Sequence, residues 1–144
     1  MPTVTLSEVL GSPVFDPGGR CGRVRELAVS PQEDPARIAI LVVRTKSGDR
    51  ALPFSSVTSI NGGLCAATSA STWTIADESE GLLLLSRDLL DQQIIDVHGR
   101  KVVRVNDVDL HQDTSSSHPT LKVAAVDVGA RGAVRRLLKG VVPA

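Results

Sequence analysis

The chain has 144 residues, of which 42% are hydrophobic and 22% are charged, a composition typical of a folded globular protein and not of a disordered one. Lys plus Arg and Asp plus Glu both number 16, so no net field would attract a polyanion such as RNA. Phe15, Phe54 and Trp73 are the only aromatic residues, too few for a surface on which nucleobases stack. A nucleic acid is therefore disfavoured as a partner.

The cysteines and the N-terminus indicate the compartment. Cys21 and Cys65 stand alone, without the CxxC spacing of a zinc site, and we expect both to be reduced thiols. The N-terminal sequence MPTVTLSEVL lacks the basic and apolar regions of a secretory signal, and no apolar stretch approaches the roughly 18 residues of a membrane span. We expect a cytoplasmic protein, either free or on the cytosolic face of the membrane.

In chain order, the first predicted elements are a helical turn and a β-hairpin. Ser7 precedes the apolar pair Val9–Leu10 and is a candidate cap of the helical turn. The run Val14 to Arg20 contains Asp16 followed by two glycines, which is typical of the turn between two strands. A polar loop is predicted over 30–36, a strand over 37–43, a turn over 46–49, and closing strands over 50–54 and 57–60.

The opening pattern recurs in the second half of the chain. The run from Val14 to Arg20 matches the run from Ile94 to Arg100, with Asp16 and Asp96 separated by 80 residues (96 − 16). Two further blocks match in the same order, and Ser86 takes the place of Ser7. Three ordered blocks indicate two copies of one unit. The further matches are Arg23–Leu27 with Arg104–Val108, and Arg37–Val43 with Lys122–Val128.

The first unit resembles the PRC-barrel family of small β-barrels. The resemblance lies in Asp16–Gly19, in Gly22-Arg23-Val24 and in Leu52-Pro53-Phe54 leading to Val57. The second unit, Leu89 to Leu138, is similar to the barrels that precede the cytosolic domains of MgtE-type magnesium transporters. The resemblance implies a mainly β protein made of two small PRC-type β-barrels in tandem, with no catalytic residues common to the family. The runs that carry the second resemblance are Asp88–Asp91, Ile94–Asp96, Gly99–Asp107 and Val126–Gly129.

The expected organisation is a PRC-barrel-like unit 1 over 1–65, a linker over 66–81 that Trp73 attaches to one unit, and unit 2 over 82–144. Unit 2 lacks the closing strands of unit 1, so its barrel would be completed by a partner, a neighbouring copy or a longer chain. Its last segment, 129–144, predicts a short amphipathic helix. The helix would pack on its own barrel, against a partner or on an anionic membrane surface. Its basic face carries Arg131, Arg135, Arg136 and Lys139.

One stripe of residues could hold a metal ion. Asp107, Asp109, His111 and Asp113 alternate with apolar residues, so they would share one face of a strand. Carboxylates and an imidazole on one face could bind Mg²⁺ or Mn²⁺ weakly. The competing interpretation, which we favour, is the solvent-exposed face of an amphipathic strand.

Candidate nucleophiles are scattered. Ser115, Ser116, Ser117 and His118 share one polar loop without an orienting carboxylate, so no enzyme is expected and no cofactor is required. We expect a non-enzymatic interaction or regulatory module, the N-terminal region or a relative of an MgtE-type magnesium transporter. Its partner would be another protein, further domains of a transporter chain, or a second copy in a homodimer. The alternatives are a divalent-cation sensor that uses the Asp107–Asp113 stripe, and an RNA- or ribosome-associated factor by analogy with the maturation factor RimM.

Overall fold

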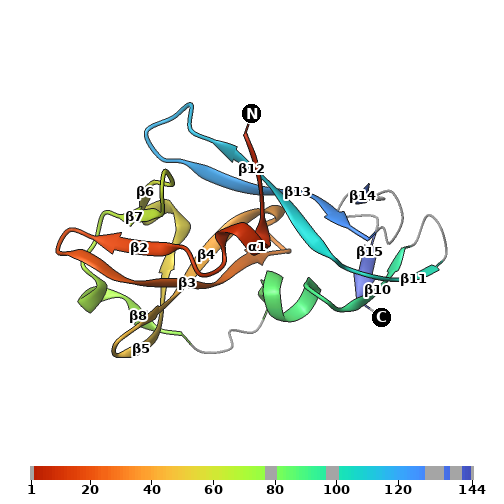
Figure 1. Cartoon of the computed structure of the whole chain (residues 1–144), viewed down its shortest axis with the longest axis horizontal. Helices are drawn as coiled ribbons and strands as arrows, with labels where there is room; N and C mark the ends of the chain where they lie inside the picture. The colour runs from red at the N-terminus through yellow and green to blue at the C-terminus, as the bar shows by residue number, and fades with distance from the viewer. Residues whose placement is uncertain (1, 77–80, 97–100, 129–134, 137–140, 144) are drawn as a thin grey trace.

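The computed structural model of the chain describes residues 2–76, 81–96, 101–128, 135–136 and 141–143. The protein is mainly β, as predicted, and its long strands form a curled sheet (Figure 1). The described helices are short, and none is long and apolar enough to cross a membrane. In order, the elements are β1 Thr3–Thr5, α1 Leu6–Val9, β2 Pro13–Asp16, β3 Gly19–Ser30, β4 Asp34–Thr45, β5 Gly48–Pro53, η1 Phe54–Ser56, β6 Val57–Ser59, β7 Leu64–Ala66, η2 Ala70–Thr72, β8 Thr74–Ile75, β9 Leu83–Leu84, η3 Leu85–Leu89, β10 Gln93–Asp96, β11 Lys101–Arg104, β12 Asp107–Asp113, β13 Thr120–Asp127, β14 Arg135–Arg136 and β15 Val141–Pro143.

One sheet runs through both units. Its order is β1-β12-β13-β4-β3-β2-β7-β6, with β5 also on β4, β8 on β5, β9 on β3 and β14 on β13. The two halves of the chain meet where β4 pairs with β13, at Arg37 opposite Lys122. Arg37 and Lys122 occupy matching positions in the two copies of the sequence repeat. The two copies therefore pair through equivalent residues. A smaller sheet has the order β11-β10-β15.

Corresponding backbone hydrogen bonds recur in the two units. Gly11 N donates to Val24 O at 2.9 Å, and Asp91 N donates to Val105 O at the same distance. Gly11 and Asp91 both have positive φ, 82° and 61°, although Asp91 has a side chain. The four-residue helix α1 corresponds to the five-residue π-turn η3, so the second unit has one more residue in this turn. The backbone thus supports the repeat found in the sequence.

Each unit gives its first strand to the other. In unit 1, β1 pairs with β12 of unit 2, with Thr5 opposite Asp109. In unit 2, β9 pairs with β3 of unit 1, with Leu84 opposite Ala28. By the alignment of the repeat, Leu84 is the counterpart of Thr5 and Ala28 that of Asp109, so the two exchanges are equivalent. Neither unit therefore completes its sheet without the other.

Carboxylates fix the exchanged helical turns in the same reciprocal way. Glu26 in β3 is 6% exposed, and it accepts hydrogen bonds from Ser86 N at 2.8 Å and Arg87 N at 3.0 Å, in the first turn of η3. Its counterpart Asp107 accepts a bond from Ser7 N, in α1, at 3.2 Å. The first N–H groups of a helix have no partner within it, so each carboxylate satisfies donors of the other unit.

The sequence suggested Ser7 and Ser86 as caps of these turns, but neither serine is the N-cap. Thr5 caps α1 through a capping box with Glu8, and the N-cap of η3 is Leu84, without a side-chain bond. Ser7 and Ser86 instead lie inside the turns, where their N–H groups meet the carboxylates. The expectation of a helical turn at the start of each unit is nevertheless met.

A single hydrophobic cluster draws on both units. It is mainly aliphatic, as the low aromatic content requires, and each helical turn contributes two residues that are at most 8% exposed. Trp73, in the expected linker, also belongs to it and donates from Nε1 to Thr68 Oγ1 at 2.9 Å. Representative members are Leu6, Val14, Leu27, Leu41 and Val57 from unit 1, and Leu85, Ile94, Val108, Leu121 and Val126 from unit 2.

The expected C-terminal helix is not found in the described part of 129–144. Residues 135–136 form β14 on the edge of β13, and 141–143 form β15 on the edge of β10. The segment contains three glycines, which disfavour a helix, and the two edges offer unpaired backbone groups. The structure thus adds a third strand, β15, to the β10–β11 hairpin that the sequence left without closing strands.

Glu26→Gln should destabilise the protein by about 1–3 kcal/mol, because it replaces charge-assisted bonds to buried N–H groups with weaker ones and turns an NH₂ group toward donors. Urea unfolding measures the loss. Glu33→Gln is the matched control, since Glu33 is exposed and its side chain has no hydrogen bond in the structure. Equal midpoints for the two variants would show that Glu26 does not hold the units together.

Candidate functional site: a basic hollow

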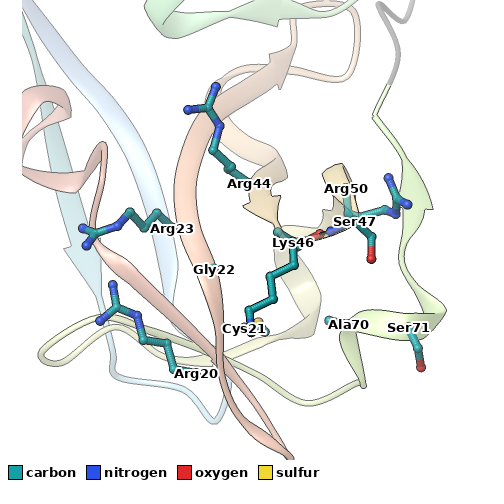
Figure 2. Close-up of a pocket in the computed structure, with 11 residues that line it drawn as sticks. Arg20, Cys21, Gly22, Arg23, Arg44, Lys46, Ser47, Arg50, Ala70 and Ser71 are labelled. Carbon is teal, nitrogen blue, oxygen red and sulfur yellow. Dashed lines mark hydrogen bonds between the residues drawn. The ribbon is translucent and has the colours of Figure 1, made fainter.

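An open hollow of about 910 Å³ lies at the end of the β3–β4–β5 meander. Figure 2 shows its side chains, which come from β3, from the ends of β4 and β5 and the turn between them, and from the η2 segment. Among the described residues, no carboxylate lines it. We call this feature the basic hollow, and its cationic lining residues are Arg20, Arg23, Arg44, Lys46 and Arg50.

Strand register brings these cations together. Arg23 in β3 lies directly opposite Arg44 in β4, whose neighbour on the other side is Asp49 in β5. Arg50 lies opposite buried Val43, so it reaches the hollow from the other face of the sheet. The turn between β4 and β5 adds Lys46.

Like charges on directly opposed positions disfavour the pairing of Arg23 with Arg44. Two contacts offset part of this cost, the position of Asp49 opposite Arg44 and the hydrogen bond from Arg23 Nη1 to the backbone O of Gly11 at 3.1 Å.

A close approach of two strands forms the floor. A Cβ atom on Gly22 would lie 2.2 Å from Arg44 O and 2.8 Å from Val43 Cγ1, so only glycine fits at this position of β3. Gly22 lies opposite Thr45 at the end of β4. A side chain at this position would therefore push β3 and β4 apart at the floor of the hollow.

Asp16 supports the opposite wall. Its Oδ1 accepts a hydrogen bond from Gly18 N at 2.9 Å, which is the turn role predicted from the sequence. Its Oδ2 accepts from Ala70 N at 2.8 Å, at the start of η2, and so attaches the wall to the β2–β3 hairpin. Buried Trp73 fixes the end of the same short helix.

Only weak ion pairs neutralise the cations. Arg44 Nε lies 3.9 Å from Asp49 Oδ1, and Arg25 Nε lies 3.9 Å from Asp49 Oδ2, all with exposed side chains. Exposed pairs of this length contribute little. Within the described part of the chain, Arg20, Lys46 and Arg50 form no ion pair. The hollow therefore keeps a concentrated positive charge although the whole chain is neutral.

Cys21 lies in the basic hollow and is half-buried. Burial, with a further contribution from the negative charge of Asp16, raises the pKa of its thiol above the ordinary value. The thiol is therefore protonated near neutral pH and is a poor nucleophile. The reactivity of Cys21 toward an alkylating reagent therefore measures how accessible the hollow is to small molecules.

The predicted metal stripe lies on a strand, β12, as expected, and Val108 and Leu110 are buried. Asp109 is only 8% exposed. Asp107 Oδ1 accepts bonds from Ser7 N and from Val108 N. No group of three His, Cys, Asp or Glu side chains among the described residues is placed to hold a metal ion. Magnesium binding at this stripe stays a prediction.

Asp113, at the end of the stripe, is bonded within its own loop. Its Oδ1 accepts bonds from Ser115 Oγ at 2.6 Å and Ser115 N at 2.9 Å, which lower its pKa. Nearby, Ser116 Oγ donates to the backbone O of His118, so the imidazole is not its acceptor. The expectation of a loop without an orienting carboxylate was therefore wrong for Ser115, whose hydroxyl donates to Asp113. This bond closes the local turn together with the bond from Ser115 N.

The other predicted surface is described only in part. Arg135 and Arg136 form β14, and Arg131 and Lys139 lie outside the described residues. Sequence reasoning also missed the basic hollow, because its cations are dispersed along the chain and are balanced in number by acidic residues. The one available signal was the cation-rich turn that follows Arg44.

No protein-family model matches the chain, and a comparison with curated proteins finds no match.

In a Cys65→Ser background, the rate at which iodoacetamide alkylates Cys21 should be low at pH 7 and should still be rising above pH 9, because only the thiolate reacts and the pKa is raised. Asp16→Asn should shift the profile to lower pH by removing a nearby negative charge. Mass spectrometry follows the reaction. A rate that levels off below pH 8 would contradict the burial of this thiol.

Proposed function

We propose that this protein is a non-enzymatic interaction module, built as two PRC-type units in tandem, that binds a negatively charged partner in the basic hollow. The observation that carries the proposal is the opposed Arg23–Arg44 pair in a hollow with no lining carboxylate among the described residues. The exposed 3.9 Å contact between Arg44 and Asp49 offsets this charge only in part, so an anion bound in the hollow would neutralise the rest.

The scaffold supports a binding role. The hollow is formed by paired strands, by a turn and by a wall attached through Asp16, so its cations start from fixed backbone positions. No described side chain in the hollow is placed as a base beside a nucleophile, and Cys21 is protonated near neutral pH. Binding without chemistry is therefore the function that this geometry supports best.

The resemblance to the barrels of MgtE-type transporters suggests where such a module would act. As a relative or the N-terminal region of a transporter chain, it would bind another protein or another domain of that chain. The basic hollow is the surface that we propose for this contact.

Tripolyphosphate, a small polyanion, should raise the melting temperature beyond a sodium chloride control of equal ionic strength. A ligand that binds only the folded state stabilises it by RT ln(1 + [L]/Kd), which is about 2.7 kcal/mol at 100-fold excess over Kd. The rise should be lost in Arg23→Gln/Arg44→Gln. The stability of this variant without ligand is expected to change little, because the like-charge pair is removed together with the hydrogen bond from Arg23 Nη1 to Gly11 O.

Arg37→Gln/Lys122→Gln is the matched control, since it also removes two exposed, opposed cations, but outside the hollow. This variant should keep the full response to tripolyphosphate. An equal rise in all three proteins would mean nonspecific screening, and no rise in any of them would remove the proposed site.

A further inference from the structure

We infer that the basic hollow binds an extended acidic segment of a protein, with carboxylates at alternate positions. This inference rests on the proposed function and names the partner of the same site. It follows from the spread of the cations, from their spacing, and from a lining that, among the described residues, contains no aromatic or large apolar side chain.

The cations surround the hollow instead of converging on one point. In Figure 2, Arg20 and Arg23 project to one side of β3, whereas Arg50 projects away from them on the far side. A single phosphate or carboxylate could not contact all of these groups. The ligand must therefore carry several negative charges along its length.

The spacing of the cations suits an extended peptide. Arg23 and Arg44 are direct neighbours on adjacent strands, which lie about 4.8 Å apart. Lys46 follows Arg44 by two residues, a separation of at most about 7 Å. In an extended peptide, side chains at alternate positions repeat at roughly 6.6 Å, so successive carboxylates can face successive cations.

Hydroxyl groups add hydrogen-bonding capacity at the rim. Ser47 and Ser71 line the hollow, and both are exposed. A hydroxyl donates to and accepts from backbone groups, which an extended peptide presents along its whole length. Arginine guanidinium groups can also bind carboxylates through two parallel bonds.

Two other polyanions fit less well. Single-stranded nucleic acid is held by aromatic rings as well as cations, and no aromatic residue lines the hollow in the described part of the chain. A bilayer surface is contacted by apolar side chains beside the cations. The exposed large apolar residues among those described are Ile75, Ile95 and Val102, and none of them lines the hollow.

Fluorescence anisotropy of a labelled peptide with Glu at alternate positions and Ser between them tests the inference. The full chain should bind the peptide saturably and more weakly as salt rises. Arg23→Gln/Arg44→Gln should weaken binding about tenfold or more, because two charge-assisted contacts are lost. Arg37→Gln/Lys122→Gln should change it by less than about twofold, since its cations lie outside the hollow. A labelled oligothymidylate of equal charge should bind more weakly than the peptide.

The outcomes separate the inference from the proposed function. A peptide that fails to bind, while tripolyphosphate still stabilises the protein through Arg23 and Arg44, would show that the inference of an acidic segment is wrong. The proposed anion site would then stand. If neither binds, both fail. Tighter binding of the oligothymidylate than of the peptide would contradict the acidic segment and would favour a nucleic acid as the partner. Equal loss in the two double variants would place binding outside the hollow.

Discussion

Glu26 and Asp107 each accept hydrogen bonds from the first turn of a short helix that belongs to the other unit. The first N–H groups of a helix have no partner within it, so an acceptor from the other unit stabilises each turn. The acceptor for η3 is the buried carboxylate of Glu26. Each turn then contributes two residues to the shared hydrophobic cluster, and the strand before it completes the neighbouring sheet. The rest of the fold depends on this exchange.

The same exchange positions the basic hollow. The far end of β3 is held by Glu26 and by β9, while its near end pairs with β2 and β4 beside the hollow. Cations that would repel one another are thus fixed on strands whose other ends are buried in the core. The core thus stabilises strands that carry neighbouring cations at their exposed ends, an arrangement that suits the proposed binding site.

Local patterns predicted much of the fold. The mainly β character, the helical turns, the hairpin turn at Asp16 and the strand at Asp107–Asp113 could all be read from spacing and turn chemistry. The exchange between units could not, because pairs such as Thr5 with Asp109 depend on contacts between distant segments. The hollow was hidden for the same reason, since register alone places Arg23 opposite Arg44. Glu26 gave no sequence signal beyond its match with Asp107.

The central claim is that the two units complete each other, and cutting the chain between them tests it most directly. A protease site placed between Ala76 and Gly81 would allow the folded protein to be cleaved into two pieces. We predict that the pieces remain together on gel filtration and that urea unfolds them in one transition, because each holds a strand and a carboxylate that the other needs. Pieces that separate and each keep the circular dichroism of folded β-structure would contradict the exchange.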